Sequence, residues 1–363
     1  MLDAPLYPVT RTHLAVLTDH IGIMQHAIGR RPDPAFGYCV DDVARALQVD
    51  LLHVRRLGWS ALAVDAWRSL RFLSDAFEPI SARFRNFRDA DGSWLVAIAS
   101  DDCQGRAMHA LGDAIATAPD ASFVLQASAL FELALPGTGG LGATRAISSV
   151  ALGCVAAALG GRLDVAPTLR LMAERLWGAF GPVQGSDWPW PEPRLTYENG
   201  LPLRALIVVG QHLGDRRMVE AGIDALDWLM VTQTAPEGHL SPVGNGWWSA
   251  AGPRGRFDQQ PIEAATLMLA AEAALFATGD DRWRIEMERA YAWFLGGNDL
   301  GVVVADPGRG GCHDGLTAAG VNLNQGAEST LMWLVALEHI RAMRRAGGDR
   351  SLKAVSRPIA VLA

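Results

Sequence analysis

The sequence contains few cysteines, and no two of them are spaced like metal ligands. Cys39, Cys103, Cys154 and Cys312 lie far apart, and none belongs to a CxxC motif. Neither a zinc site nor a disulfide framework is therefore expected. The nine histidines are equally scattered, and the chain lacks the GxxxxGK(S/T), GxSxG and HExxH motifs. We accordingly expect no metal and no other cofactor.

Positive charge is also scarce. Lys and Arg number 32 against 39 Asp and Glu, which gives a formal net charge of −7, and no long basic run occurs. Nucleic acids and anionic membranes are therefore unfavourable partners. No apolar stretch approaches the roughly 18 residues of a membrane span, and the N-terminus lacks a charged segment followed by an apolar one. We expect a soluble, cytoplasmic protein.

Tryptophan, in contrast, is abundant, with 12 Trp against 4 Tyr. Several tryptophans lie in segments rich in Pro and Gly, namely Trp188, Trp190, Trp247 and Trp248. Tryptophans of a protein core usually fall within periodic runs, so tryptophans in loops suggest flat platforms on which sugar rings can pack. The alternative is that these side chains anchor the loops to the body of the protein.

Half of the residues are hydrophobic, and their spacing follows a helical period almost everywhere. We predict a single domain over residues 1–363, with a poorly ordered tail after about residue 346. Residues 86–96 and 301–306 are compatible with short strands. The twelve predicted helices span residues 11–28, 41–57, 60–77, 102–116, 122–135, 142–160, 166–180, 198–213, 216–231, 258–277, 280–295 and 324–345.

Most of the polar, chemically reactive segments precede alternate helices of this series. Starts of the even-numbered helices are separated by 40–66 residues, which is typical of a repeat of helical hairpins. Six hairpins closed into a ring would bring these starts to one end of an inner circle, where unpaired N–H groups favour carboxylates and hydroxyls. The predicted fold is therefore all-α, an (α/α)6 barrel, and an open α-solenoid is the structural alternative.

Two of these segments contain consecutive aspartates. Asp41 and Asp42 open the second predicted helix, shortly after Tyr38, and Asp101 and Asp102 open the fourth. One aspartate of each pair can cap its helix, but two carboxylates exceed what capping needs. We therefore expect at least one aspartate of each pair to face a ligand.

The fourth predicted helix carries a further pattern. Asp102, Arg106 and His109 are spaced so that an acid, a cation and an imidazole share one helical face. Such a combination is unusual for a core-facing stripe and suggests a substrate-binding surface. The alternative is a capped helix with an internal Asp–Arg pair.

Three further segments combine acids, amides and aromatic groups suited to sugar hydroxyls. The alternative for the first is a well-packed loop, and for the second a capping arrangement of Asp258 or Gln260 with Glu263. The candidates are Trp190, Arg194, Tyr197, Glu198 and Asn199 before the eighth helix; Asp258 and Gln259 before the tenth; and His313, Asp314, Asn324, Gln325 and Glu328 around the start of the twelfth.

With these motifs in hand, the sequence resembles the six-hairpin (α/α)6-barrel glycosidase superfamily. Within it, the chain is similar to a bacterial group often fused to, or named after, glycosyltransferases, which implies carbohydrate chemistry and a possible glycosyltransferase partner. No Rossmann-like nucleotide-sugar domain is present, so a glycosyltransferase activity of its own is not expected. The matching segments are GYCVDDVARAL, SDDCQGRAMHALG, WPWPEPRLTYENGLPLRAL, FDQQPIEA, FLGGNDLG and NQGAEST.

The leading hypothesis is a glycoside hydrolase that cleaves a bacterial oligo- or polysaccharide. Hydrolysis of this kind commonly uses two carboxyl groups, one as acid and one as base or nucleophile. We predict Asp102 as the acid and Asp42 or Asp258 as its partner, with Glu198 and Glu328 in reserve. The remaining candidates, including Tyr38, Asp41 and Arg106, would bind substrate.

Two other hypotheses remain open. Similarity to the N-acylglucosamine 2-epimerase fold makes a sugar epimerase or isomerase plausible, with His109 and His313 as acid and base. The chain would otherwise be a non-catalytic carbohydrate-binding partner of a glycosyltransferase, in which the acids only accept hydrogen bonds.

Overall fold

The computed structural model describes residues 4–95 and 100–348 of the chain. These residues form two compact units, which are described separately. Residues 15–27 and 31–176 make up the N-terminal unit, and residues 4–14, 28–30 and 177–348 make up the C-terminal unit. The predicted tail after about residue 346 falls almost wholly outside the described residues.

Twelve α-helices lie within the described residues, and eleven of them match a predicted helix to within three residues at either end. The helices are α1 Thr12–Leu17, α2 Val40–Leu57, α3 Trp59–Ala76, α4 Asp101–Thr117, α5 Ala121–Ala134, α6 Thr144–Gly160, α7 Ala166–Phe180, α8 Gly200–Leu213, α9 Arg216–Thr232, α10 Pro261–Thr278, α11 Arg282–Phe294 and α12 Ala327–Gly348.

The exception is the first helix, for which the prediction of residues 11–28 was wrong. Helix α1 ends at Leu17, and the chain then turns at Asp19. The Asp19 carboxylate accepts the N–H groups of Ile21 (2.8 Å) and Gly22 (3.1 Å), and its own N–H donates to the Gly22 carbonyl (3.0 Å). An aspartate that bonds to the backbone ahead of it offers the chain an alternative to the helix.

The strands are short and form antiparallel pairs: β3 with β6 and β4 with β5 in the N-terminal unit, and β7 with β8, β9 with β10 and β11 with β12 in the C-terminal unit. Strands β6 and β9 fall within the two segments predicted to hold strands. The bounds are β1 Ala27–Ile28, β2 Arg31–Pro32, β3 Tyr38–Cys39, β4 Phe77–Glu78, β5 Arg83–Phe84, β6 Phe87–Arg88, β7 Arg194–Leu195, β8 Trp248–Ser249, β9 Ala305–Asp306, β10 Gly311–Cys312, β11 Gly315–Thr317 and β12 Gly320–Asn322.

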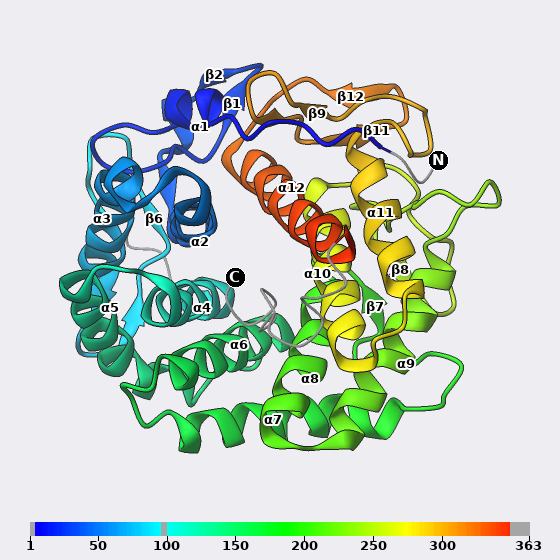
Figure 1. Cartoon of the computed structure of the whole chain (residues 1–363), viewed down its shortest axis with the longest axis horizontal. Coiled ribbons are helices and arrows are strands. Elements are labelled where there is room, and N and C mark those ends of the chain that lie inside the picture. The colour runs from blue at the N-terminus through cyan, green and yellow to red at the C-terminus, as the bar shows by residue number, and fades with distance from the viewer. Residues whose placement is uncertain (1–3, 96–99, 349–363) are drawn as a thin grey trace. The chain divides into compact units, whose positions relative to one another are not determined.

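In the N-terminal unit, α2, α4 and α6 lie next to one another, while α3 and α5 pack against α2 and α4 as hairpin partners (Figure 1). Helices α4 and α6 are buried on all sides along most of their length, whereas α3 buries one face only. A helix that is apolar on all sides is typical of a protein core, whereas a helix with one apolar face packs that face against the core and exposes the other to solvent. The even-numbered helices are therefore the inner ones.

Helices α4 and α6 meet through glycines. A Cβ atom added to Gly112 of α4 would lie 2.2 Å from the Gly153 carbonyl oxygen of α6. A Cβ atom added to Gly153 would lie 2.5 Å from the Met108 carbonyl oxygen. The two backbones are thus in direct contact, which only glycine permits.

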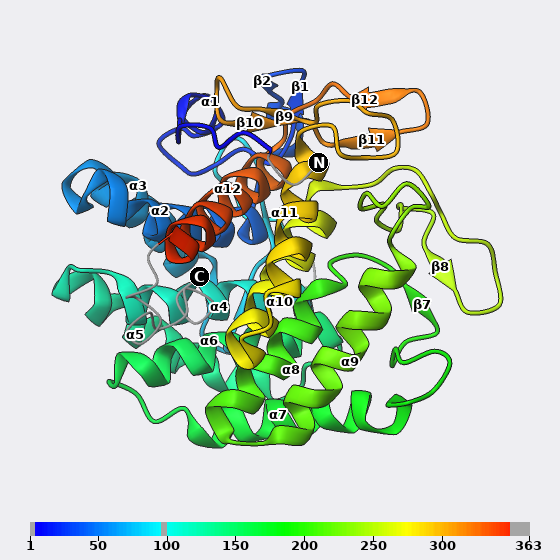
Figure 2. The same cartoon turned by 45° about the vertical axis from the view of Figure 1, so that its right-hand side comes forward.

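In the C-terminal unit, α8 pairs with α9 and α10 pairs with α11, and α10 packs against both α8 and α12 (Figure 2). Every residue from Pro261 to Leu275 of α10 is buried. By length and composition alone α10 would be able to cross a membrane, but 83% of it is buried inside the protein. Such burial is the property of a core helix.

Candidate functional site

The consecutive aspartates of α2 and α4 do not cap their own helices. The N-cap of α2 is Cys39, whose sulfur accepts the Asp42 N–H at 3.4 Å. The N-cap of α4 is Ser100, whose hydroxyl oxygen accepts the Cys103 N–H at 3.0 Å. The aspartate side chains are therefore available for other interactions.

One aspartate of each pair has a structural role. The Asp42 carboxylate is 4% exposed, pairs with Arg45 at 3.0 Å and accepts a hydrogen bond from the Cys39 thiol at 3.0 Å. Asp101 pairs with Arg83 at 2.8 Å and accepts the N–H groups of Gly142 (2.8 Å) and Ala143, just before α6 begins. Burial alone would raise the pKa of Asp101, but these backbone hydrogen bonds and Arg83 lower it.

The other aspartate of each pair meets a common arginine. Arg106 Nε lies 3.6 Å from an Asp41 oxygen, and Arg106 Nη2 lies 3.9 Å from an Asp102 oxygen. The Asp41 and Asp102 side chains are 23% and 17% exposed, whereas Arg106 is almost completely buried. We call Asp41, Asp102 and Arg106 the aspartate cluster. The contact between Asp102 and Arg106 is the internal Asp–Arg pair of the alternative interpretation, and Asp41 is more exposed than Asp42.

Two other candidates of the N-terminal unit, His109 and Tyr38, are buried. His109 Nε2 lies 3.7 Å from a carboxylate oxygen of Asp113, which in turn accepts a hydrogen bond from Gln48 at 2.7 Å. Tyr38 is fully buried and its hydroxyl donates to Asp19 at 2.6 Å. Burial, followed by this hydrogen bond, raises the pKa of Tyr38 well above its ordinary value. Tyr38 thus has a structural partner in place of an exposed hydroxyl.

In the C-terminal unit, Glu263 of α10 reaches the start of α8. Its carboxylate accepts the backbone N–H groups of Glu198 and Asn199 and the Asn199 side-chain amide, the last at 3.0 Å. The N-cap of α10, Gln260, makes no side-chain capping bond. The capping arrangement considered for Asp258 or Gln260 with Glu263 was therefore wrong, because Glu263 serves the neighbouring helix.

This contact predicts a stability effect. Replacing Glu263 by alanine should lower the free energy of unfolding by about 1–3 kcal/mol, since buried donors lose their acceptor. Thermal denaturation would measure the change. The control is Glu220→Ala, which removes an exposed carboxylate 3.4 Å from Arg216 and should have little effect. Equal stability of the two variants would contradict this role of Glu263.

Asp258 and Gln259 have opposite environments. Gln259 is completely buried: its side chain accepts the Trp293 indole N–H at 2.9 Å and donates to Asp299 at 2.5 Å. Asp258 is exposed and has a left-handed backbone, with φ of 60°. Glu198 also has a positive φ, of 52°. Non-glycine residues in this conformation cluster at functional sites, which supports Asp258 and Glu198 as candidates and assigns Gln259 a supporting role.

The buried carboxylate of Asp299 holds this segment together. It accepts hydrogen bonds from Gln259 and from Arg256, the latter at 3.0 Å, and it lies 3.6 Å from His239 Nε2. Burial by itself would raise the pKa of Asp299, but the hydrogen bonds from Gln259, Ser241 and Arg256 lower it. Asp299 belongs to the FLGGNDLG segment, but its partners Arg256 and Gln259 lie 43 and 40 residues away in the sequence, so the segment alone does not indicate them.

The loop tryptophans are mostly packed. Trp190 is 1% exposed and packs edge-on against Phe180, with ring centroids 5.6 Å apart. Trp188 packs edge-on against Trp248, with ring centroids 5.2 Å apart. For these two tryptophans the structure agrees with the alternative interpretation, in which the side chains anchor the loops to the body of the protein. Among the named aromatic candidates, the exposed rings of this unit are Tyr197 and Trp247, and Arg194 is exposed on β7.

The segment before α12 is tied down by several of its candidate residues. Asp314 accepts the Gly326 N–H at 2.7 Å, and the Asn324 side chain accepts the Gly29 N–H at 2.9 Å. The Gln325 carbonyl lies 2.9 Å from His13 Nε2. These contacts position the start of α12. His313 and Glu328 are half-buried in the same region.

Within residues 4–95 and 100–348, no three His, Cys, Asp or Glu side chains are grouped as metal ligands.

No protein-family model matches the chain, and no curated protein sequence matches it. Solved structures do match, and they identify the fold as an (α/α)6 barrel, which confirms the predicted fold class.

Three of these structures illustrate the range of enzymes that share the fold. The cellobiose 2-epimerase of Bacillus thermoamylovorans has 13% identity and a TM-score of 0.70, over 91% of this chain and 95% of that one. The GH76 α-mannanase of Bacteroides thetaiotaomicron has 10% identity and a TM-score of 0.61, over 86% and 88%.

The third is an inactive α-1,6-mannanase variant from a Salegentibacter species, in complex with a mannotetraose. It has 14% identity and a TM-score of 0.50, over 84% of this chain and 100% of that one. The comparisons give no support to the expected link with glycosyltransferases.

Proposed function

We propose that this chain is a carbohydrate-active enzyme, and specifically a glycoside hydrolase. The observation that carries the proposal is the aspartate cluster. Asp41 and Asp102 stand in the first turns of adjacent inner helices, both partly exposed and both within 4 Å of Arg106. Glycoside hydrolysis commonly requires two carboxyl groups that flank one bond, about 5–9.5 Å apart.

The proposed mechanism assigns each group a task. Asp102 donates a proton to the glycosidic oxygen as the bond from the sugar carbon to that oxygen breaks. Asp41 takes a proton from the attacking water or attacks the carbon itself. Arg106 binds the carboxylates and restrains their orientation. Asp42 is less suited, because Arg45 and Cys39 already occupy its carboxylate.

The mannanases support this assignment. In the Salegentibacter enzyme, replacement of two consecutive aspartates by alanine gives an inactive variant. The present chain has two such pairs, Asp41–Asp42 and Asp101–Asp102, each at the start of an inner helix. In each pair one aspartate has a structural role and the other belongs to the aspartate cluster. An α-linked mannan oligosaccharide is therefore the first substrate to test.

A sugar 2-epimerase or isomerase is the second candidate function. Two observations favour it: the cellobiose 2-epimerase superposes with a higher TM-score than the mannanases, and His109 stands beside the buried carboxylate of Asp113. An imidazole paired with a carboxylate can take up and release a proton near neutral pH. Epimerisation moves a proton at carbon and needs such a group.

Time-resolved proton NMR of the anomeric region separates these functions. The purified chain is added to α-1,6-mannotetraose, cellobiose and free mannose. We expect new reducing-end signals from the tetrasaccharide, and the first anomer to appear distinguishes inversion from retention. Conversion of cellobiose or mannose without cleavage would instead establish the epimerase or isomerase. Absence of any change across a wider panel of oligosaccharides would favour the non-catalytic binding protein.

A further inference from the structure

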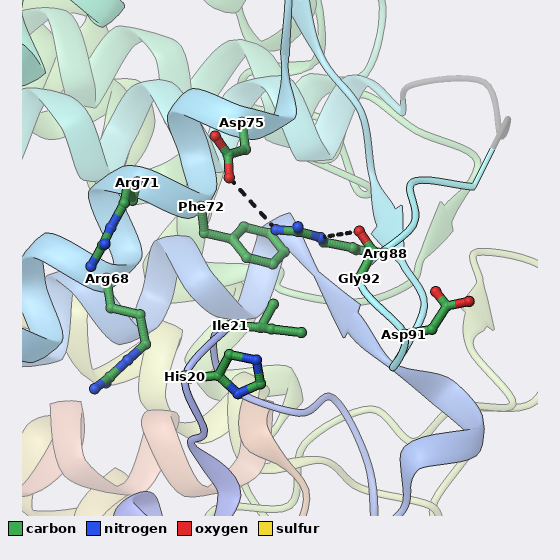
Figure 3. Close-up of a pocket in the computed structure, with 9 residues that line it drawn as sticks. All are labelled: His20, Ile21, Arg68, Arg71, Phe72, Asp75, Arg88, Asp91 and Gly92. Atoms are coloured by element: carbon green, nitrogen blue, oxygen red, sulfur yellow. Dashed lines mark hydrogen bonds and ion pairs between the residues drawn. The ribbon is translucent and has the colours of Figure 1, made fainter.

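The N-terminal unit contains a pocket of about 360 Å³ that includes no member of the aspartate cluster. Figure 3 shows its residues. Arg68 and Arg71 extend from the C-terminal half of α3, Arg88 reaches over from β6, and His20 follows α1. The volume falls at the lower end of the range of small-molecule sites, about 300–1,000 Å³.

Arg88 is held in a defined position inside this pocket. Its Nε donates to the Gly92 carbonyl at 2.7 Å, and its guanidinium lies 5.7 Å from the centroid of Phe72 and 5.3 Å from that of Trp94. The nearest carboxylate, Asp75, is 3.7 Å away and mostly exposed, so it neutralises the arginine weakly. An immobilised guanidinium loses little entropy when it binds a ligand.

The other two arginines supply accessible positive charge. Arg71 is exposed and has no carboxylate partner among the described residues. Arg68 uses one nitrogen for Asp65, at 2.6 Å, which leaves its remaining N–H donors for a ligand. The second acid of the lining, Asp91, is turned to the backbone N–H (2.9 Å) and hydroxyl of Ser93.

We propose that this pocket, lined by Arg68, Arg71 and Arg88, binds the phosphate or carboxylate group of a monosaccharide-sized molecule. Guanidinium groups match the oxygens of both anions in paired hydrogen bonds. Three arginines at one small pocket also stand out in a chain of net charge −7, in which anions are otherwise repelled. The binding site does not depend on the proposed hydrolase activity.

Isothermal titration calorimetry of the full chain tests this assignment, with glucose 6-phosphate, glucuronate and neutral glucose as probes. We expect at least one of the two anions to bind with a dissociation constant below about 1 mM, and glucose not to bind detectably. The better anion identifies the group that the site recognises. Arg71→Gln should weaken this binding about tenfold or more, because a charge-assisted contact is lost.

The matched control is Arg55→Gln, which removes an exposed arginine from the last turn of α2, outside the pocket. It should bind the anion like the unmodified chain. The proposal is overturned if neither anion binds at 10-fold higher concentrations than expected, if glucose binds equally well, or if Arg55→Gln and Arg71→Gln weaken binding alike. These readouts measure binding alone, so their failure leaves the hydrolase proposal untouched.

Discussion

Replacing Asp102 by asparagine should reduce turnover by at least about 10³-fold while the protein remains folded. Asparagine keeps the size of the side chain and its hydrogen-bonding capacity but cannot deliver a proton to the glycosidic oxygen. The Asp102 side chain is 17% exposed and lies 3.9 Å from Arg106, and an asparagine of nearly equal volume leaves no cavity there. Initial rates on the substrate identified by NMR, together with thermal denaturation, measure both quantities.

The neighbouring aspartate provides a matched control for this experiment. Asp101→Asn changes the same side chain at the preceding position, but Asp101 pairs with Arg83 and accepts the N–H groups of Gly142 and Ala143, just before α6 begins. Its loss should lower stability by about 1 kcal/mol and leave turnover close to that of the unmodified chain. Near-normal turnover of Asp102→Asn, or an equal loss in both variants, would exclude Asp102 as the proton donor.

The contrast between these aspartates explains how far the sequence could predict the site. The sequence indicated that two adjacent acids exceed what one helix cap requires, and it located both pairs at inner-helix starts. It could not indicate which acid is structural, because the partners of Asp101 lie 41 and 42 residues away. Glu263 similarly contacts Glu198 and Asn199 over 65 and 64 residues. Hydrogen bonds supplied by a neighbouring helix have no local sequence signature.

The fold was easier to predict from the sequence than the site, for a physical reason. Inner helices such as α10 are long apolar runs, and polar loops separate them, so the length and the boundaries of each helix are visible in the sequence. The prediction failed in the segment after α1, where Leu17, Ile21 and Met24 continue the helical spacing although Asp19 turns the chain. For Trp190, the composition of a loop suggested a platform for sugar rings, but the ring is packed against Phe180.

The glycine contact between α4 and α6 predicts the largest loss of stability. Replacing Gly112 by alanine places a methyl group 2.2 Å from the Gly153 carbonyl oxygen, and the atom in the way is backbone, which no rotamer change can move. The two inner helices must separate, and we expect unfolding to require about 3 kcal/mol less free energy, the upper part of the range for overpacked cores. Urea denaturation followed by circular dichroism measures this change.

Gly178→Ala is the control that isolates the clash. Gly178 lies in α7, and a Cβ atom added there meets no atom within 4 Å. Because alanine loses less backbone entropy than glycine in a helix, this variant should be more stable by about 0.5–1 kcal/mol. The same substitution thus has opposite expected signs at the two positions, so a general effect of alanine cannot account for both. Stabilisation of Gly112→Ala would mean that α4 and α6 do not pack backbone to backbone.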